Sequence, residues 1–110
     1  MGKYAMVVYS KALPGREAEF NHWYDTVHYA DICAIPGVIS GRRFDTTPVG
    51  MGPDMPPYLA IYEVEAENPA DILVEMGKRQ AAGQMTLTDS IDPAATNLRF
   101  YALHEMAARG

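Results

Sequence analysis

The sequence predicts an α+β domain whose strands and helices follow in the order β-α-β-β-α-β. Three observations support this order. Four short runs are rich in β-branched and aromatic residues, two segments between them have helical periodicity, and proline or glycine marks most borders. The chain has 110 residues, which suffices for one hydrophobic core. We therefore treat residues 1–110 as a single domain.

The first predicted strand covers Lys3 to Ser10 and ends before the turn at Leu13-Pro14-Gly15. Its apolar residues do not alternate cleanly with polar ones. This pattern is typical of a strand that is covered on both faces, so we expect a central position in the sheet.

The first predicted helix runs from Arg16 to about Val27. Four apolar residues at spacings i, i+3, i+4 and i+7 form one stripe along it: Phe20, Trp23, Tyr24 and Val27. The helical pattern continues, with a kink, to about Ala34. Pro36-Gly37 then ends it, because a residue before proline avoids the helical region.

The second predicted strand is Val38 to Thr47, with Gly41 as a candidate bulge. Residues 48–57 are rich in proline and glycine and predict a loop, either a functional lid or a plain hairpin connection. The third predicted strand is Tyr58 to Glu65.

The second predicted helix begins after Asn68, with a proline at its first position, and runs towards Ala82. Residues 85–96 carry no clear period. The last predicted strand runs from Leu98 to about Met106. This order predicts a ferredoxin-like fold, in which two helices pack on one face of a four-stranded antiparallel sheet. The other face is not fully polar in any strand register, so we expect a second copy to cover it in a symmetric homodimer.

Composition excludes several classes of protein. Apolar residues make up 48% and charged residues 21% of the chain, which is ordinary for a globular domain. The net charge of −5 makes nucleic acid an unexpected partner. No apolar run approaches the ~20 residues that span a bilayer, so no membrane partner is expected. Met1-Gly2-Lys3-Tyr4 leads into a strand without a signal-peptide cleavage site.

Cys33 is the single cysteine and cannot form an intramolecular disulfide. This fits a reducing, cytoplasmic location. Cys33 is either a small apolar core residue or a nucleophile, and the core interpretation is the simpler one.

The first helix and the strand after it resemble a known superfamily. The stretch Glu19-Phe20-Asn21-His22-Trp23-Tyr24-Asp25-Thr26-Val27-His28 is followed by Ile35-Pro36-Gly37-Val38 and by Arg42-Arg43-Phe44. These residues resemble the dimeric α+β barrel proteins, and among them the EthD-like proteins with an F-x-x-W-Y-x-x-x-H helix. The resemblance implies a barrel formed across a dimer and a pocket between the helices and the sheet of each subunit. It maps the histidine of the motif onto His28.

His28 is the candidate general acid/base. It follows Tyr24 by four residues and Asp25 by three, so at about 100° per residue the three share one sector of the helix. Tyr24 is in the apolar stripe, so this sector borders the core. Imidazole titrates near neutral pH, and Asp25 is placed to orient it. The alternatives are a hydrogen-bonded core histidine and a solvated Asp25.

Four other residues are candidates for substrate binding. Trp23 and Tyr24 could stack on an aromatic ligand or simply form core. Tyr62, which shares a strand face with Tyr58, could polarise a carbonyl. Arg42 and Arg43 point to opposite faces, and we select Arg43 to bind a carboxylate or phenolate, against the alternative of a surface charge.

No metal or cofactor is expected. His22 and His28 lie about 240° apart around a helix, and no paired His or Cys motif occurs. Haem ligation by His28 or His104 has no second supporting feature, and no glycine-rich phosphate loop is present.

We therefore hypothesise a cofactor-independent isomerase, cyclase or lyase acting on a small aromatic or cyclic carbonyl compound. The alternatives are a non-catalytic ligand-binding accessory dimer and a cofactor-free monooxygenase.

Overall fold

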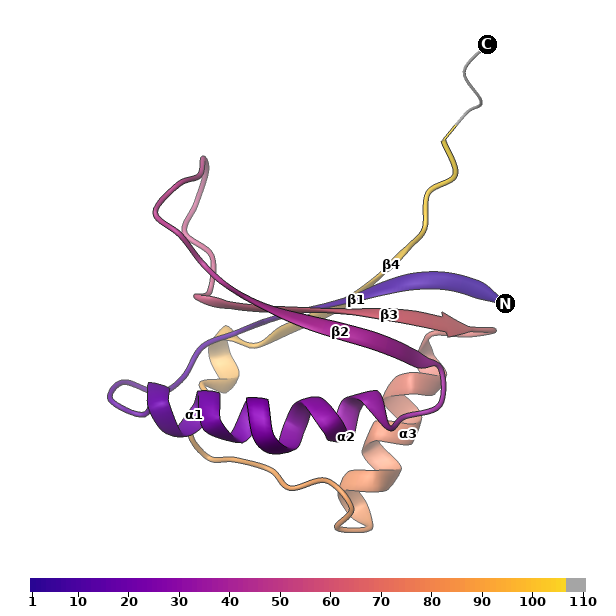
Figure 1. Cartoon of the computed structure of the whole chain (residues 1–110), viewed down its shortest axis with the longest axis horizontal. Coiled ribbons are helices and arrows are strands. Elements are labelled where there is room, and N and C mark those ends of the chain that lie inside the picture. Colours follow the sequence, from indigo (N-terminus) through magenta and orange to yellow (C-terminus); the bar gives the residue numbers. More distant parts are fainter. Residues whose placement is uncertain (107–110) are drawn as a thin grey trace.

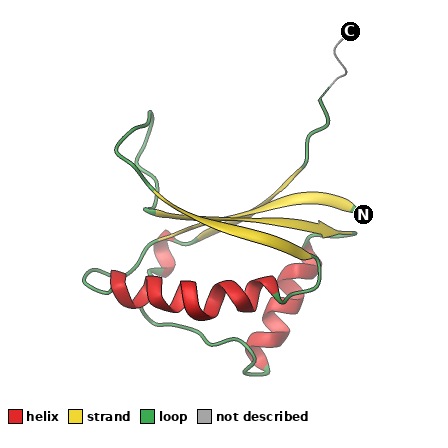
Figure 2. Cartoon of the chain, in the orientation of Figure 1, coloured by secondary structure: helices red, strands yellow, loops and turns green. Residues whose placement is uncertain are grey.

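The computed structural model describes residues 1–106, in which the helices form one layer and the strands another (Figure 2). The elements follow the predicted order. The bounds are β1 Gly2–Ser10, α1 Glu17–Trp23, η1 Tyr24–His28, α2 Tyr29–Cys33, β2 Val38–Asp45, β3 Tyr58–Ala66, α3 Ala70–Ala81, η2 Pro93–Ala95 and β4 Asn97–Ala102.

The four strands form one antiparallel sheet in the order β2-β3-β1-β4. β1 lies between β3 and β4, so its predicted central position is confirmed. The helices all lie on one face of the sheet, and the other face carries none (Figure 1). This arrangement is the predicted ferredoxin-like fold.

The segments α1, η1 and α2 form one long helix from Glu17 to Cys33, which confirms the predicted extension towards Ala34. Its middle is a π-helical turn. The N–H of Tyr29 bonds to the carbonyl oxygen of Tyr24, five residues earlier. The helix has no proline or glycine that would cause a sharp kink. The irregularity that the sequence predicted is instead a local change of helical pitch.

The core lies between the helices and the sheet. Its largest fully buried side chains come from both layers: Tyr62, Phe20, Met6, Ile32, Ile35, Ile72 and Val64. Met6 on β1 and Tyr62 and Val64 on β3 lie at alternate positions, as a strand with one face towards the helices requires.

The opposite face of the sheet is apolar at its centre. Val7 and Ile61 lie side by side on β1 and β3, and Arg42 and Arg99 flank them on the outer strands. Tyr101 is 58% exposed although it is large and aromatic. In the single chain this face is uncovered, and its pairing with a second copy stays a prediction.

Two details of the strands differ from prediction. The register shift in β2 lies between Val38 and Ser40, so Gly41 is not a bulge. Gly41 instead makes room for an aromatic ring, because a Cβ atom there would lie 2.5 Å from Tyr62 Cδ1. β4 ends at Ala102 rather than near Met106, and the N–H of Leu103 makes one further bond to the carbonyl of Lys3.

The irregular segments lie at opposite sides of the sheet. The loop between β2 and β3 rises on the side away from the helices (Figure 1). The segment after α3 returns beneath the helix layer towards β4, with η2 as its only regular turn in the described chain (Figure 1). In residues 1–106, no helix has the length and apolar character needed to cross a bilayer.

Candidate active site

A cavity of about 220 Å³ lies between the long helix and the sheet. Most of its lining is apolar, and the aliphatic and methionine side chains are Met6, Val8, Ile32, Met76, Leu87, Ile91 and Leu98. No Asp, Glu, Lys or Arg is among the lining residues. The cavity therefore suits an uncharged ligand, because burying an unpaired charge there would be costly.

His28 lines this cavity. Its Nδ1 atom is buried and has no hydrogen-bond partner in the described part of the chain. A buried polar atom without a partner is rare, and a bound ligand would supply one. His28 therefore lies beside a hollow in the core, as the sequence predicted.

Burial lowers the pKa of His28 from its ordinary value of 6.5 to about 4. The charge of Asp31 raises this pKa and that of Arg43 lowers it, but both effects are smaller than burial. The imidazole is therefore neutral at pH 7. This corrects the expectation of titration near neutral pH, which used the value of a solvated ring.

The ring of His28 is fixed by two aromatic neighbours. It is stacked on Trp23, with ring centroids 4.3 Å apart and planes at 20°, and Tyr24 meets it edge-on at 4.9 Å. In an α-helix, residues i and i+5 are separated by about 140° around the axis. The π-helical turn closes this separation, so it is what allows Trp23 and His28 to stack.

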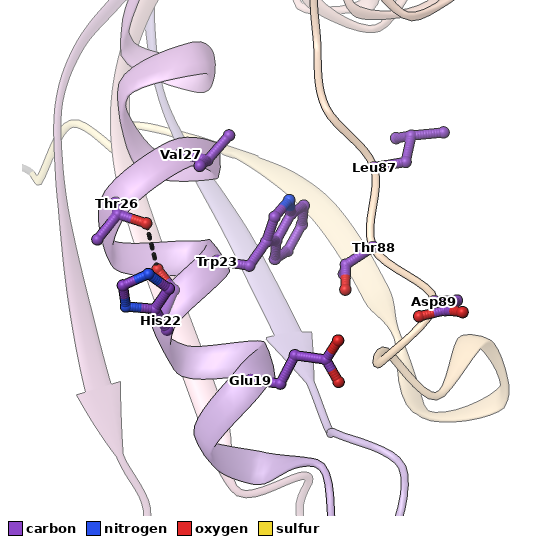
Figure 3. A pocket seen from close by; sticks show the side chains of 8 residues that line it. All are labelled: Glu19, His22, Trp23, Thr26, Val27, Leu87, Thr88 and Asp89. Carbon is purple, nitrogen blue, oxygen red and sulfur yellow. Dashed lines mark hydrogen bonds between the residues drawn. The ribbon is translucent and has the colours of Figure 1, made fainter.

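Trp23 is in turn held by the irregular segment after α3. Its indole N–H donates to the carbonyl oxygen of Thr86 at 2.8 Å. Figure 3 shows the indole projecting from the helix towards the chain that carries Leu87 and Thr88. These three residues line both the inner cavity and an outer groove of about 660 Å³, so they form the wall between the two.

Tyr24 and Tyr62 meet across the cavity wall. Their hydroxyl oxygens are 3.0 Å apart, and both side chains are almost fully buried. Burial raises the pKa of both phenols, so both stay protonated at neutral pH. Both predicted residues therefore do line the cavity, together with Trp23.

The other two predicted residues do not line it. The Asp25 carboxylate accepts a hydrogen bond from Arg43 at 2.6 Å, and Arg43 also donates to the side chain of Asn21. The Arg43 guanidinium lies 4.2 Å from the centroid of the Tyr24 ring, outside the cavity lining.

The orienting role expected of Asp25 is thus wrong in this structure, because Asp25 pairs with a cation on β2 instead of with His28. Arg43 already binds a carboxylate, that of Asp25. Arg43 packs against the Tyr24 ring from outside the cavity, and Asp25 is its ion-pair partner.

Several residues that line the cavity were not predicted from the sequence. Leu87, Thr88 and Ile91 come from the irregular segment, and Met76 and Gln80 come from α3. No periodicity in residues 85–96 indicated that they would meet the first helix.

The remaining candidates for metal or haem binding are dispersed. Within the described residues, no three His, Cys, Asp or Glu side chains gather as a metal site would require. His104 lines a different hollow, on the face of the sheet opposite His28. Cys33 is a half-buried free thiol that packs beside the core.

The fold of this chain, a four-stranded antiparallel sheet with its helices on one face, is shared by known structures. A proposed monooxygenase from Shewanella loihica PV-4 matches with a TM-score of 0.61 and 18% identity, over 96% of this chain and 97% of that one. An EthD family protein from Bacillus halodurans C-125 matches with a TM-score of 0.59 and 16% identity, over 96% of this chain and 100% of that one.

A third structure, HapK from Hahella chejuensis, matches with a TM-score of 0.50 and 14% identity, over 100% of this chain and 97% of that one. No protein-family model matches the sequence, and neither does any curated protein. At these identities the likeness establishes the fold, and it agrees with the EthD-like resemblance of the helix motif.

Proposed function

We propose that this protein is a cofactor-independent enzyme that moves a proton on a small, uncharged aromatic or cyclic carbonyl compound. The reaction class is an isomerisation, a cyclisation or a lyase step. The observation that carries the proposal is the buried, unpartnered Nδ1 of His28 in a cavity whose lining has no charged side chain.

The size of the cavity limits the ligand. A cavity of about 150 Å³ lined by apolar side chains holds benzene. The present cavity of about 220 Å³ therefore suits a substituted single ring or a small fused ring.

The neutral ring of His28 is in the form that accepts a proton. In the proposed step, a ring nitrogen takes the proton from the carbon next to a ligand carbonyl. The electrons of the C–H bond form a C=C bond, and the carbonyl π electrons move to its oxygen, which gives an enolate. Return of the proton to the same carbon is exchange, and its delivery to another carbon is isomerisation. No oxidant or reductant is consumed.

Two alternatives remain as proposals. A non-catalytic accessory dimer would bind the same compounds and leave them unchanged. A cofactor-free monooxygenase would use oxygen on an electron-rich phenol, and the fold shared with the Shewanella loihica protein favours this alternative.

The test uses hydrogen–deuterium exchange at the carbon next to the carbonyl of 1-indanone and 2-cyclohexenone, followed by proton NMR in D₂O. The wild-type protein should accelerate exchange, and His28→Gln should be slower by at least about 10²-fold. His22→Gln is the matched control, because His22 lies exposed on the same helix. Equal exchange in wild type and His28→Gln would exclude the proposal.

The alternatives give different results in the same samples. Binding of 1-indanone without exchange would support the accessory protein. Oxygen consumption with hydroquinone above the protein-free rate would support the monooxygenase.

We propose further that the working form is a homodimer joined through the sheet face opposite the helices. Its apolar centre at Val7 and Ile61, with exposed Tyr101, supports this assembly. A cytoplasmic location, expected from the single cysteine, is also a proposal.

A further inference from the structure

Tyr24 and Tyr62 have two hydroxyl hydrogens between them, and only one of these is used in a hydrogen bond. Each phenol carries one hydrogen, and the contact at 3.0 Å between the two oxygens uses one of the two. Neither hydroxyl has another hydrogen-bond partner among residues 1–106. Whichever phenol donates to the other, the second hydrogen belongs to a residue that lines the cavity.

Both phenols keep their hydrogens at neutral pH. The side chains are only 3% and 1% exposed, and burial is the main reason that the pKa of each is raised. A protonated phenol in an apolar cavity without an acceptor is an unsatisfied donor, which is costly to bury.

The pair is also held in place from several sides. A Cβ atom at Gly41 would lie 2.5 Å from the Tyr62 ring, so that ring lies directly on the backbone of β2. The Tyr29 ring stacks on Tyr62 with centroids 6.3 Å apart. The Arg43 guanidinium lies 4.2 Å from the centroid of Tyr24. Donors fixed in this way stabilise a developing charge without having to reorganise.

We infer that the Tyr24–Tyr62 pair donates its spare hydrogen to the carbonyl oxygen of the ligand while His28 accepts a proton from the neighbouring carbon. This inference rests on the proposed function and narrows its substrate class to enolisable cyclic ketones and lactones. The enolate oxygen formed in the step receives the phenol hydrogen bond, and the phenol keeps its proton. A weakly basic imidazole needs such a donor, because it can remove a carbon-bound proton only if the enolate is stabilised.

The test compares binding of 1-indanone with binding of indane, which has the same shape but no carbonyl. Trp23 is the single tryptophan and lines the cavity, so its fluorescence reports occupancy. The variants are Tyr24→Phe, Tyr62→Phe, the double variant and, as a control outside the cavity, His22→Gln. Both phenylalanine changes keep the rings and remove only the hydroxyls.

Wild type should bind 1-indanone about tenfold more tightly than indane, as expected for one hydrogen bond to a buried donor. The double variant should lose this preference and still bind indane. Each single variant should keep part of the preference, because the remaining phenol still has a free hydrogen. His22→Gln, whose ring is exposed and outside the cavity lining, should keep all of it.

The outcomes separate this inference from the proposed function. A double variant that keeps both the preference and the exchange rate of wild type would overturn the tyrosine role and leave His28 in place. If the preference for 1-indanone over indane depends on the two phenols but wild type catalyses no hydrogen–deuterium exchange, the phenols act as hydrogen-bond donors. The proposed enzymatic function would then be wrong. The inference would be overturned if wild type bound 1-indanone and indane with equal affinity. It would also be overturned if neither ligand changed the fluorescence of Trp23.

Discussion

The imidazole of His28 lies nearly parallel to the indole of Trp23, five residues earlier, with ring centroids 4.3 Å apart. Tyr24 closes a second side of the ring edge-on. This packing removes water from most of the imidazole and leaves its Nδ1 without a partner. The same burial that makes His28 available to a ligand also makes its charged form unfavourable.

The first prediction concerns stability against pH. The folded pKa of about 4 lies below the ordinary 6.5, so the unfolded chain binds the extra proton first as the pH falls. The folded state should therefore lose about 3 kcal/mol through His28 between pH 7 and pH 4, and nothing above pH 7. Urea unfolding at several pH values should show a shallower pH dependence for His28→Gln than for wild type.

His22→Gln is the control for this comparison, because its ring is exposed on the same helix. It should have the same pH dependence as wild type. A His28→Gln curve parallel to that of wild type would mean that the ring of His28 is solvated.

The second prediction concerns Gly41. Its replacement by alanine would put a Cβ atom 2.5 Å from the ring of Tyr62, which is only 1% exposed and cannot move freely. We expect Gly41→Ala to lower the free energy of unfolding by about 1–3 kcal/mol through overpacking. Because the Tyr62 hydroxyl would shift, the preference for 1-indanone over indane should also fall.

Gly77→Ala is the matched control, since a Cβ there meets nothing within 4 Å. It should leave the ligand preference unchanged and tend to stabilise α3. Unchanged stability and preference in Gly41→Ala would show that Tyr62 is not held in the way described.

The third prediction separates Arg43 from its neighbour Arg42. Arg43 pairs with Asp25, bonds to Asn21 and lies over the ring of Tyr24. Arg43→Gln should lower the free energy of unfolding by about 1–2 kcal/mol, because it removes a cation–π contact and a partly buried ion pair. Arg42→Gln, on the opposite face of β2, should cost less than about 0.5 kcal/mol.

Binding of indane should distinguish a supporting role for Arg43 from a direct one. We expect little change in the affinity of Arg43→Gln for this uncharged ligand, because Arg43 does not line the cavity. Strong binding of benzoate by wild type that is lost in Arg43→Gln would restore the anion-binding role expected from the sequence.

The fourth prediction concerns the homodimer. Ile61 lies at the centre of the uncovered sheet face, beside Val7. Ile61→Glu would bury a carboxylate in the proposed interface, so it should give monomers in sedimentation velocity where wild type gives dimers. Val74→Glu is the control, because Val74 is 55% exposed on α3 and lies in the helix layer. A monomeric wild-type protein would contradict the proposed assembly.

The order and type of the elements were predictable because hydrophobic period and turn residues act locally. Of the predicted stripe, Phe20 and Tyr24 lie in the core against the sheet, whereas Val27 lies on the outer groove. The π-helical turn has no such local signal in the sequence, so the stacking of Trp23 on His28 could not be predicted. The partner of Asp25 was also unpredictable, because Arg43 is distant in sequence and reaches Asp25 only through the packing of the helix on β2.

The central claim is that His28 is a neutral ring inside a ligand cavity, and nitrogen-15 NMR of the histidine side chains tests it most directly. The resonances of His28 should keep the neutral pattern down to about pH 5 and should shift when 1-indanone is added. A ring that titrates near pH 6.5 and does not respond to 1-indanone would contradict the claim.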